Sequence, residues 1–167
     1  MIILVLYRQV DLQLDKASSQ PTLSEMTTRA LELVSNTDKP FILFVEAGKI
    51  DLSAHSNDAA AHYWEVHEYQ NTIEVIENFL AQREAEGKSD TAVITTSDHS
   101  TGGISTGRSF NNDTYPPYTW FPDVILRVNC SMERIATRQM AGEKLEDVYM
   151  ECTGYMNFHT CLILKYL

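Results

Sequence analysis

Two short apolar runs, each followed by acidic and histidine side chains, place the strongest constraint on how this chain can fold. The runs cover residues 41–45 and 91–96 and are rich in β-branched and aromatic residues, a pattern typical of buried strands in a parallel sheet. Ligands bind outside the carboxyl ends of such strands. The candidate ligands that follow the two runs are Glu46, Asp51, His55, Asp98 and His99. Carboxylates and imidazoles gathered in this way predict a multi-metal hydrolytic site.

The order of elements predicts an α/β fold with a mainly parallel sheet. Residues 1–7 form an apolar stretch that we expect to be a strand, and a capping-box pattern, Thr22 to Glu25, predicts a helix start. A long helix is expected to begin at Asn57 or Asp58, between the two apolar runs. Strands alternating with helices in this order are the βαβ pattern of a parallel sheet. A chain that opens on a core strand is expected to start partway through a domain.

Two regions are expected within one domain. Residues 1–107 are interpreted as part of an α/β metal-binding core, and residues 108–167 as an aromatic loop followed by an insertion-like helical region. Helical periodicity in that second region predicts a helix over residues 132–140. The three cysteines, Cys130, Cys152 and Cys161, allow one disulfide, and none forms a C-x-x-C pair.

Composition narrows the class of partner. The chain has 167 residues with 23 acidic and 13 basic side chains, giving a net charge of −10. Nucleic-acid binding needs clustered Lys and Arg, so a nucleic-acid partner is not expected. No apolar stretch has the length of a transmembrane helix. The apolar start lacks the basic residues and cleavage site of a signal peptide.

The spacing within each cluster indicates how ions could be shared. Asp51 and His55 are four residues apart, so on a helical turn they lie on one face and can hold one ion. Glu46 is better suited to a neighbouring ion bound through oxygens. Asp98 and His99 can face one ion where the chain turns, and Gly102-Gly103 allows a sharp turn there.

These stretches resemble the alkaline phosphatase family. Residues 45–55, Val-Glu-Ala-Gly-Lys-Ile-Asp-x-x-x-His, look like its first metal-binding stretch, and residues 95–103, Thr-Thr-Ser-Asp-His-Ser-Thr-Gly-Gly, resemble its second. Residues 21–27 are similar to the helix start that precedes the first stretch. Ala47 stands where a Gly is commoner in the family. The resemblance covers roughly residues 1–123 and implies part of a three-layer sandwich.

The resemblance also implies roles for individual residues. Asp51 and His55 would bind the zinc that activates the attacking water, and Asp98 and His99 the second zinc, which also holds the nucleophile oxygen. Glu46 would bind magnesium. The implied reaction is hydrolysis of phosphate monoesters through a phosphoserine, by an enzyme that forms a homodimer when full-length. The implied location is the periplasm or the extracellular surface.

Several parts of the family's site have no match in this chain. The serine nucleophile lies in an Asp-Ser-Ala stretch, and no such stretch occurs here. An early Asp shared by zinc and magnesium and an Arg that grips phosphate are also missing. The last zinc His belongs to a His-x-Gly-Glu-Asp-Val stretch, but Glu143 occupies the His position before the partial echo at residues 146–148. The chain is therefore expected to be an inactive segment that carries half a site.

Other interpretations stay open at this point. One is a pseudo-enzyme that retains metal ligands without the nucleophile, and another is a metallohydrolase of the same superfamily, such as a sulfatase or phosphoglycerate mutase relative. The remaining candidates favour structural roles: packing for the two helix histidines and the tryptophan, and orientation of the ligands or turn capping for the two hydroxyl residues. These candidates are His62, His67, Trp120, Ser100 and Thr101, while His159 is a weak substitute for the missing zinc His.

Overall fold

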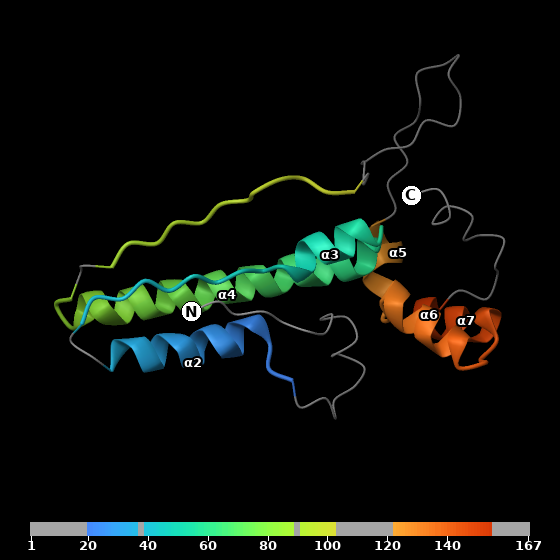
Figure 1. The fold of residues 1–167 in the computed structure, drawn as a ribbon, viewed down its shortest axis with the longest axis horizontal. Helices are drawn as coiled ribbons and strands as arrows, with labels where there is room; N and C mark the ends of the chain where they lie inside the picture. Colours follow the sequence, from blue (N-terminus) through green and yellow to red (C-terminus); the bar gives the residue numbers. More distant parts are fainter. Residues whose placement is uncertain (1–19, 37–38, 89–90, 103–121, 155–167) are drawn as a thin grey trace, which may run out of the picture.

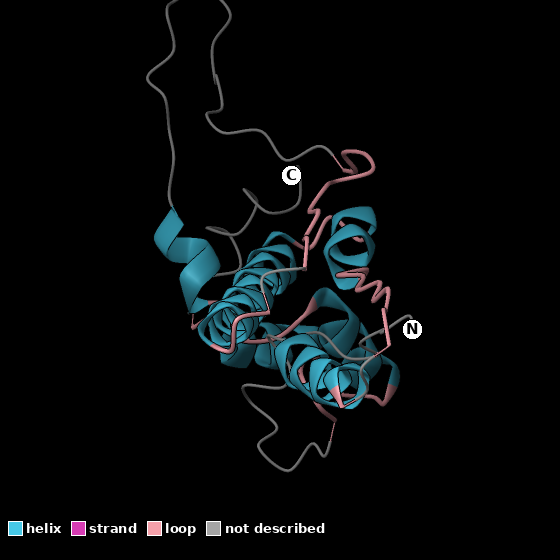
Figure 2. Ribbon diagram, turned by 90° about the vertical axis from the view of Figure 1, so that its left-hand side faces the viewer, coloured by secondary structure: helices cyan, strands magenta, loops and turns pink. Residues whose placement is uncertain are grey.

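The computed structural model describes residues 20–36, 39–88, 91–102 and 122–154. Figure 1 shows helices α2 and α3 lying along α4, with α6 and α7 beside each other at the end of the molecule where α3 lies. Figure 2 shows the same helices after a 90° turn about the vertical axis, so that the view runs along the long axis of the molecule. The helices are α2 (Leu23–Ser35), α3 (Lys49–His55), α4 (Ala59–Ala85), α5 (Pro122–Arg127), α6 (Met132–Met140) and α7 (Leu145–Thr153).

The predicted α/β fold, a partial three-layer sandwich with a mainly parallel sheet, is wrong for the part of the chain that the structure describes. That part contains helices, turns and extended segments, with no strand. Residues 41–45 and 91–96 are extended but are not paired into a ladder. A strand needs a neighbouring backbone about 4.8 Å away, and an apolar run does not supply that neighbour. Ile42 and Ile94 are accordingly 93% and 91% exposed.

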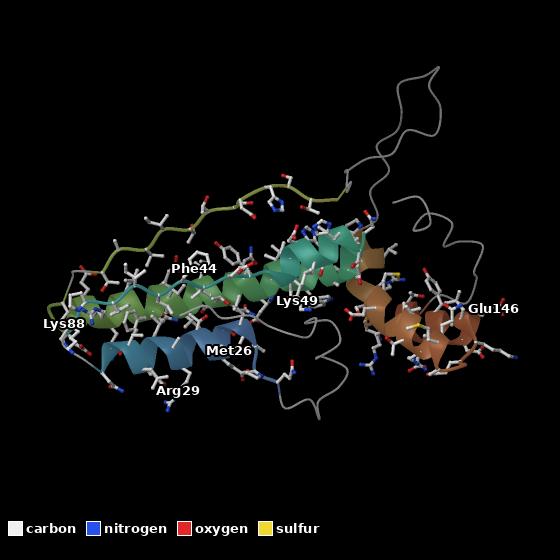
Figure 3. All side chains as sticks on the ribbon, in the orientation of Figure 1. Met26, Arg29, Phe44, Lys49, Lys88 and Glu146 are labelled. Atoms are coloured by element: carbon white, nitrogen blue, oxygen red, sulfur yellow. A yellow bond between two sulfur atoms is a disulfide. The ribbon has the colours of Figure 1, made fainter. Side chains whose placement is uncertain are left out.

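Helix α2 confirms the predicted capping box. The Thr22 hydroxyl accepts a hydrogen bond from the Glu25 N–H, and the Glu25 carboxylate accepts one from the Thr22 N–H at 2.8 Å. Leu23 and Ala30 are buried on the face where Leu43 of the first extended segment also packs, while Arg29 points outward (Figure 3). This packing holds the extended segment that leads into Glu46 and α3.

The corner between α3 and α4 is a tight turn. Asn57 has a φ of 50°, in the left-handed region that Asn tolerates better than most residues. Asp58 is the N-cap of the 27-residue helix α4, and its carboxylate accepts from the Ala61 N–H at 2.9 Å. The predicted start of the long helix is therefore confirmed, with Asp58 as its cap.

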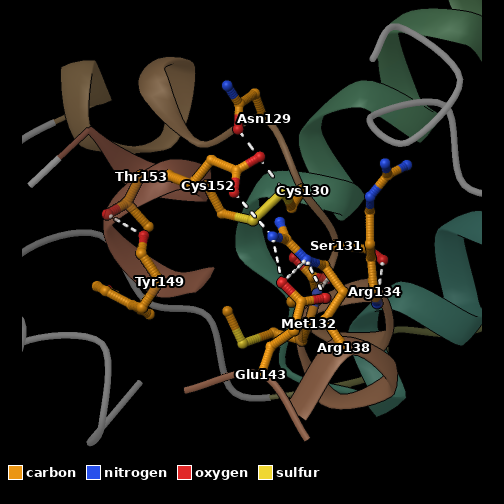
Figure 4. The surroundings of a disulfide bond; sticks show 12 residues. Asn129, Cys130, Ser131, Met132, Arg134, Arg138, Glu143, Tyr149, Cys152 and Thr153 are labelled. Atoms are coloured by element: carbon orange, nitrogen blue, oxygen red, sulfur yellow. Dashed lines mark hydrogen bonds and ion pairs between the residues drawn. A yellow bond between two sulfur atoms is a disulfide. The ribbon is translucent and has the colours of Figure 1, made fainter. Parts of the chain in front are cut away.

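Helices α6 and α7 form a pair closed by the disulfide Cys130–Cys152 (Figure 4). The predicted bounds of the first helix, 132–140, are confirmed. Ile135 and Val148 are buried in one small core with the two disulfide-bonded cysteines. A core this small stabilises little by itself, so the covalent link between the two ends contributes substantially to holding this pair.

An ion-pair network ties the two helices on their outer side. The Arg138 guanidinium donates to the carboxylates of Glu143 at 2.6 Å and Glu151 at 2.8 Å. These hydrogen bonds lower the pKa of both glutamates and raise the pKa of Arg138. Glu143 therefore has a structural partner in this helix pair.

Some expectations fall outside the described ranges. The strand predicted over residues 1–7, the boundary at 107/108, Trp120 and His159 all lie among residues that the structure does not describe. Among the helices it does describe, none combines the length and apolar character needed to cross a membrane.

Candidate metal centre

Helix α3 presents the first predicted pair on one face. Asp51 and His55 lie one turn apart, and Asp51 Oδ2 is 3.3 Å from His55 Nε2. Helix geometry dictates this contact, because residues four apart on a helix are neighbours. The spacing of these two residues in the sequence is therefore realised as a carboxylate–imidazole pair that joins the first and last turns of a seven-residue helix.

The second pair follows residues 91–96 and returns to α3. Asp98 Oδ2 is 3.0 Å from His99 Nε2, and His99 Nδ1 is 3.9 Å from Asp51 Oδ1. We call Asp51, His55, Asp98 and His99 the four-residue cluster. The structure brings together these four of the five predicted ligands, although they come from segments more than 40 residues apart. Asp51 is central, because its two oxygens face histidines from different segments.

Thr101 orients one member of the four-residue cluster. Its hydroxyl is hydrogen-bonded to His99 Nδ1 at 2.9 Å, which leaves His99 Nε2 directed toward Asp98. Polar partners of this kind fix the ring orientation of metal-binding histidines. The expectation that the hydroxyl residues near this pair orient the adjacent side chains is therefore confirmed for Thr101.

Gly102 brings the second segment close to α3. Its φ is +85°, and a Cβ added there would lie 3.0 Å from the carbonyl oxygen of Ala54. Only glycine combines this backbone conformation with so close an approach at little cost. Of the turn predicted at Gly102-Gly103, the structure describes the bend at Gly102, and Gly103 lies outside the described residues. The contact of Gly102 with α3 carried no signal in the sequence.

We expect Gly102→Ala to separate the two halves of the four-residue cluster. The methyl group meets a backbone carbonyl, which cannot move aside as a flexible side chain can, and the positive φ is strained for alanine. The contact between His99 and Asp51 should lengthen, and metal affinity should fall about tenfold. Zinc titration of parent and variant measures this, with Gly87→Ala as control, since Gly87 also has a positive φ but has open space around it. Equal zinc affinities in parent and Gly102→Ala would contradict the expectation.

The four-residue cluster contains a buried acceptor without a hydrogen bond. Asp51 Oδ1 has no hydrogen-bond partner in the part of the chain that the structure describes. An unpaired buried carboxylate oxygen is costly, and a cation bound at Asp51 would offset that cost. Carboxylate oxygen and imidazole nitrogen are both common zinc ligands. The residues therefore fit a metal ion, in pairs: no group of three or more His, Cys, Asp or Glu among the described residues is arranged to hold one.

Glu46 lies in different surroundings. It lines a small cavity together with Leu23, Lys49 and two carboxylates of α4, Glu65 and Glu68. No hydrogen bond or ion pair in the described ranges joins Glu46 to the four-residue cluster. Its assignment to a different ion stays a prediction.

The helix histidines favour the structural interpretation. His67 packs beside the rings of Tyr63 and Trp64, with centroid distances of 6.5 and 5.9 Å. The His62 backbone N–H makes an ordinary first-turn bond to the Asp58 carbonyl. Neither imidazole is joined to the four-residue cluster by an ion pair that the structure describes, so the ligand candidates remain those on α3 and on residues 98–99.

Comparisons with known proteins agree on one family. Residues 2–150 match the family described as Alkaline phosphatase. The chain is 38% identical over 123 residues to the alkaline phosphatase of Schizosaccharomyces pombe, across 71% of this chain and 22% of that protein. It is 30% identical to alkaline phosphatase 4 of Bacillus subtilis, across 81% of this chain and 27% of that protein.

A solved structure matches most of the fold. The cold-active alkaline phosphatase from the psychrophile Shewanella sp. superposes with a TM-score of 0.74 and 30% sequence identity. The match covers 95% of this chain but 36% of that structure. The chain therefore spans about a fifth to a third of the length of these relatives.

Proposed function

This chain belongs to the alkaline phosphatase family, and we propose that it supplies the metal-binding part of a hydrolase that acts on phosphate monoesters. In this proposal Asp51 and His55 bind one zinc ion, and Asp98 and His99 bind a second. Glu46 binds magnesium on the side of the small cavity that it lines. The family assignment gives the reaction class, and the residue roles are our inference.

One observation carries the zinc assignment. Asp51 Oδ1 is buried, accepts no hydrogen bond from the described residues and lies 3.9 Å from His99 Nδ1, while Asp51 Oδ2 lies 3.3 Å from His55 Nε2. A carboxylate between two imidazoles with one oxygen unsatisfied favours cation binding, because a cation offsets the cost of burying that oxygen.

The residues of this chain would bind and orient, and the bound ions would supply the polarisation. Such ions polarise phosphate oxygens and lower the pKa of a nucleophile beside them. Asp51 links the two carboxylate–imidazole pairs, and Thr101 holds the His99 ring through its Nδ1. The side chains of His55 and His99 are 64% and 53% exposed, so a phosphate group can approach the four-residue cluster from solvent.

The whole enzyme needs parts outside this chain. No Asp-Ser-Ala stretch occurs here, so the covalent step needs a serine from elsewhere, and the homodimer implied by the family is proposed for the longer protein. A metal-binding pseudo-enzyme that keeps these ligands is the second candidate function. The buried disulfide Cys130–Cys152 supports a periplasmic or extracellular location, because disulfides persist in oxidising compartments.

Zinc calorimetry on the 167-residue chain tests the proposal. We expect weak binding, because each ion receives two protein ligands instead of the usual three or four. Asp51→Ala combined with His55→Ala should remove one weak site, and adding Asp98→Ala and His99→Ala should remove both. His62→Ala with His67→Ala serves as the control and should bind zinc as the parent does. Unchanged zinc binding after all four substitutions in the four-residue cluster would refute the assignment.

A further inference from the structure

Asp58 is a buried carboxylate outside the four-residue cluster, and it joins helices that lie next to that cluster. Asp58 is 2% exposed. Its Oδ1 accepts from the Ala61 N–H at 2.9 Å, and its Oδ2 accepts from the Met132 N–H at 2.6 Å. A single side chain therefore caps the N-termini of two helices, α4 and α6. Both helix termini carry partial positive charge, so a carboxylate between them stabilises both.

The backbone of the same turn contacts the end of α3. The Asp58 N–H donates to the Ser53 carbonyl at 3.0 Å, and the Asn57 N–H donates to the Ala54 carbonyl at 2.9 Å. Ser53 and Ala54 are both buried. The last turn of α3 is therefore fixed by the turn at residues 57–58 as well as by its own helical bonds. His55 lies in that last turn, and Asp51 lies one turn before it.

The segment that carries Asp98 and His99 also lies close to the Ala54 carbonyl. A Cβ on Gly102 would lie 3.0 Å from the Ala54 oxygen, and Gly102 follows Asp98 and His99 by a few residues. The Ala54 carbonyl is thus close both to the turn at residues 57–58, through the Asn57 N–H, and to the segment with the second pair, through Gly102. A shift of the turn at residues 57–58 would therefore change the distance between the pair on α3 and the pair at residues 98–99.

We propose that Asp58 is a positioning residue for the four-residue cluster. Its carboxylate binds the N-termini of α4 and α6, and the turn at residues 57–58 holds the last turn of α3. The position of that last turn sets the distance between the two carboxylate–imidazole pairs. The effect on zinc rests on the proposed function, whereas the effect on α3 does not. Asp58 acts through the backbone that its carboxylate and its own N–H hold.

The test compares Asp58→Asn with Thr22→Ala in the full 167-residue chain. Asparagine keeps the shape of the side chain but offers one acceptor oxygen to two N–H groups. Thr22→Ala removes the side-chain cap of α2 and leaves α3 unchanged. Zinc is titrated while the ring nitrogens of His55 and His99 are followed by NMR. Amide hydrogen exchange is measured in parallel at residues 56–58, whose N–H groups bond back into α3.

We expect Asp58→Asn to weaken zinc binding at His55 and His99 about tenfold, as loss of a supporting interaction does at other metal sites. Exchange at residues 56–58 should quicken in Asp58→Asn and stay at the parent rate in Thr22→Ala. Parent-like exchange at these amides in Asp58→Asn, or an unchanged zinc affinity where the parent binds zinc, would overturn the proposal. If the parent shows no zinc response, the proposed function fails, and the exchange rates alone decide whether Asp58 positions α3.

Discussion

The isolated 167-residue chain is expected to hydrolyse an aryl phosphate no faster than zinc and magnesium ions alone. Enzymes of ordinary efficiency accelerate their reactions by about a millionfold or more, and the whole of that effect should be missing. The family's route needs a serine nucleophile, and the sequence has no Asp-Ser-Ala stretch. Each ion would also be held by two ligands from this chain, which leaves it loosely positioned.

The decisive comparison is between the chain and its Asp98→Ala/His99→Ala variant at saturating zinc. Both should give the rate of the metal-only control. Supplying the upstream and downstream segments that the longer relatives possess should give zinc-dependent turnover at alkaline pH, and the double variant should abolish it. A zinc-dependent rate in the isolated parent that disappears in the variant would contradict our account of the missing parts.

The features that the sequence predicted well are local. The capping box at Thr22, the Asp58 cap of α4 and the helix over residues 132–140 were all confirmed. Each depends on side chains within one or two helical turns, so the information lies within a short window. The same holds for Asp51 and His55, whose four-residue spacing is enough to bring them together on a helix.

The features that failed or were missed depend on distant partners. Residues 41–45 and 91–96 have the composition of strands, but a ladder is a property of two neighbouring backbones, and the described ranges provide none for them. Ile42 and Ile94 are exposed, so no part of the described chain covers these two apolar side chains. Composition predicts that a segment suits a sheet; it does not predict which segment pairs with it.

In the candidate site, too, the local features could be predicted from the sequence and the long-range contacts could not. Its ligand types and their grouping into two pairs could be proposed from sequence, because each pair lies within five residues. The central place of Asp51 could not, because it depends on a contact with His99, 48 positions further along the chain. The bond between Asp58 and the Met132 N–H joins positions 74 apart. Asp58 was recognisable as a helix cap, but its second bond to α6 had no local signal.

Removing the disulfide should produce the largest loss of stability in this chain. Cys130 and Cys152 are 2% and 0% exposed and are separated by 22 positions. Loop-closure entropy for a link of this span corresponds to about 3 kcal/mol of stabilisation, by restricting the unfolded chain. The helix pair that the link closes has few buried apolar side chains, Ile135 and Val148 foremost, so packing cannot replace the link.

Cys130→Ala/Cys152→Ala in a Cys161→Ala background, compared with Cys161→Ala alone, isolates this effect from exchange with the third thiol. Urea unfolding followed by circular dichroism should give a free energy of unfolding lower by about 3 kcal/mol. Amide exchange should quicken first at Ile135 and Val148, whose N–H groups bond to Ser131 and Lys144 at the starts of their helices. Because Asp58 holds α6 through the Met132 N–H, the loosened pair should also weaken that bond. An unchanged unfolding midpoint would mean that packing and the Arg138 ion pairs hold α6 and α7 together without the covalent link.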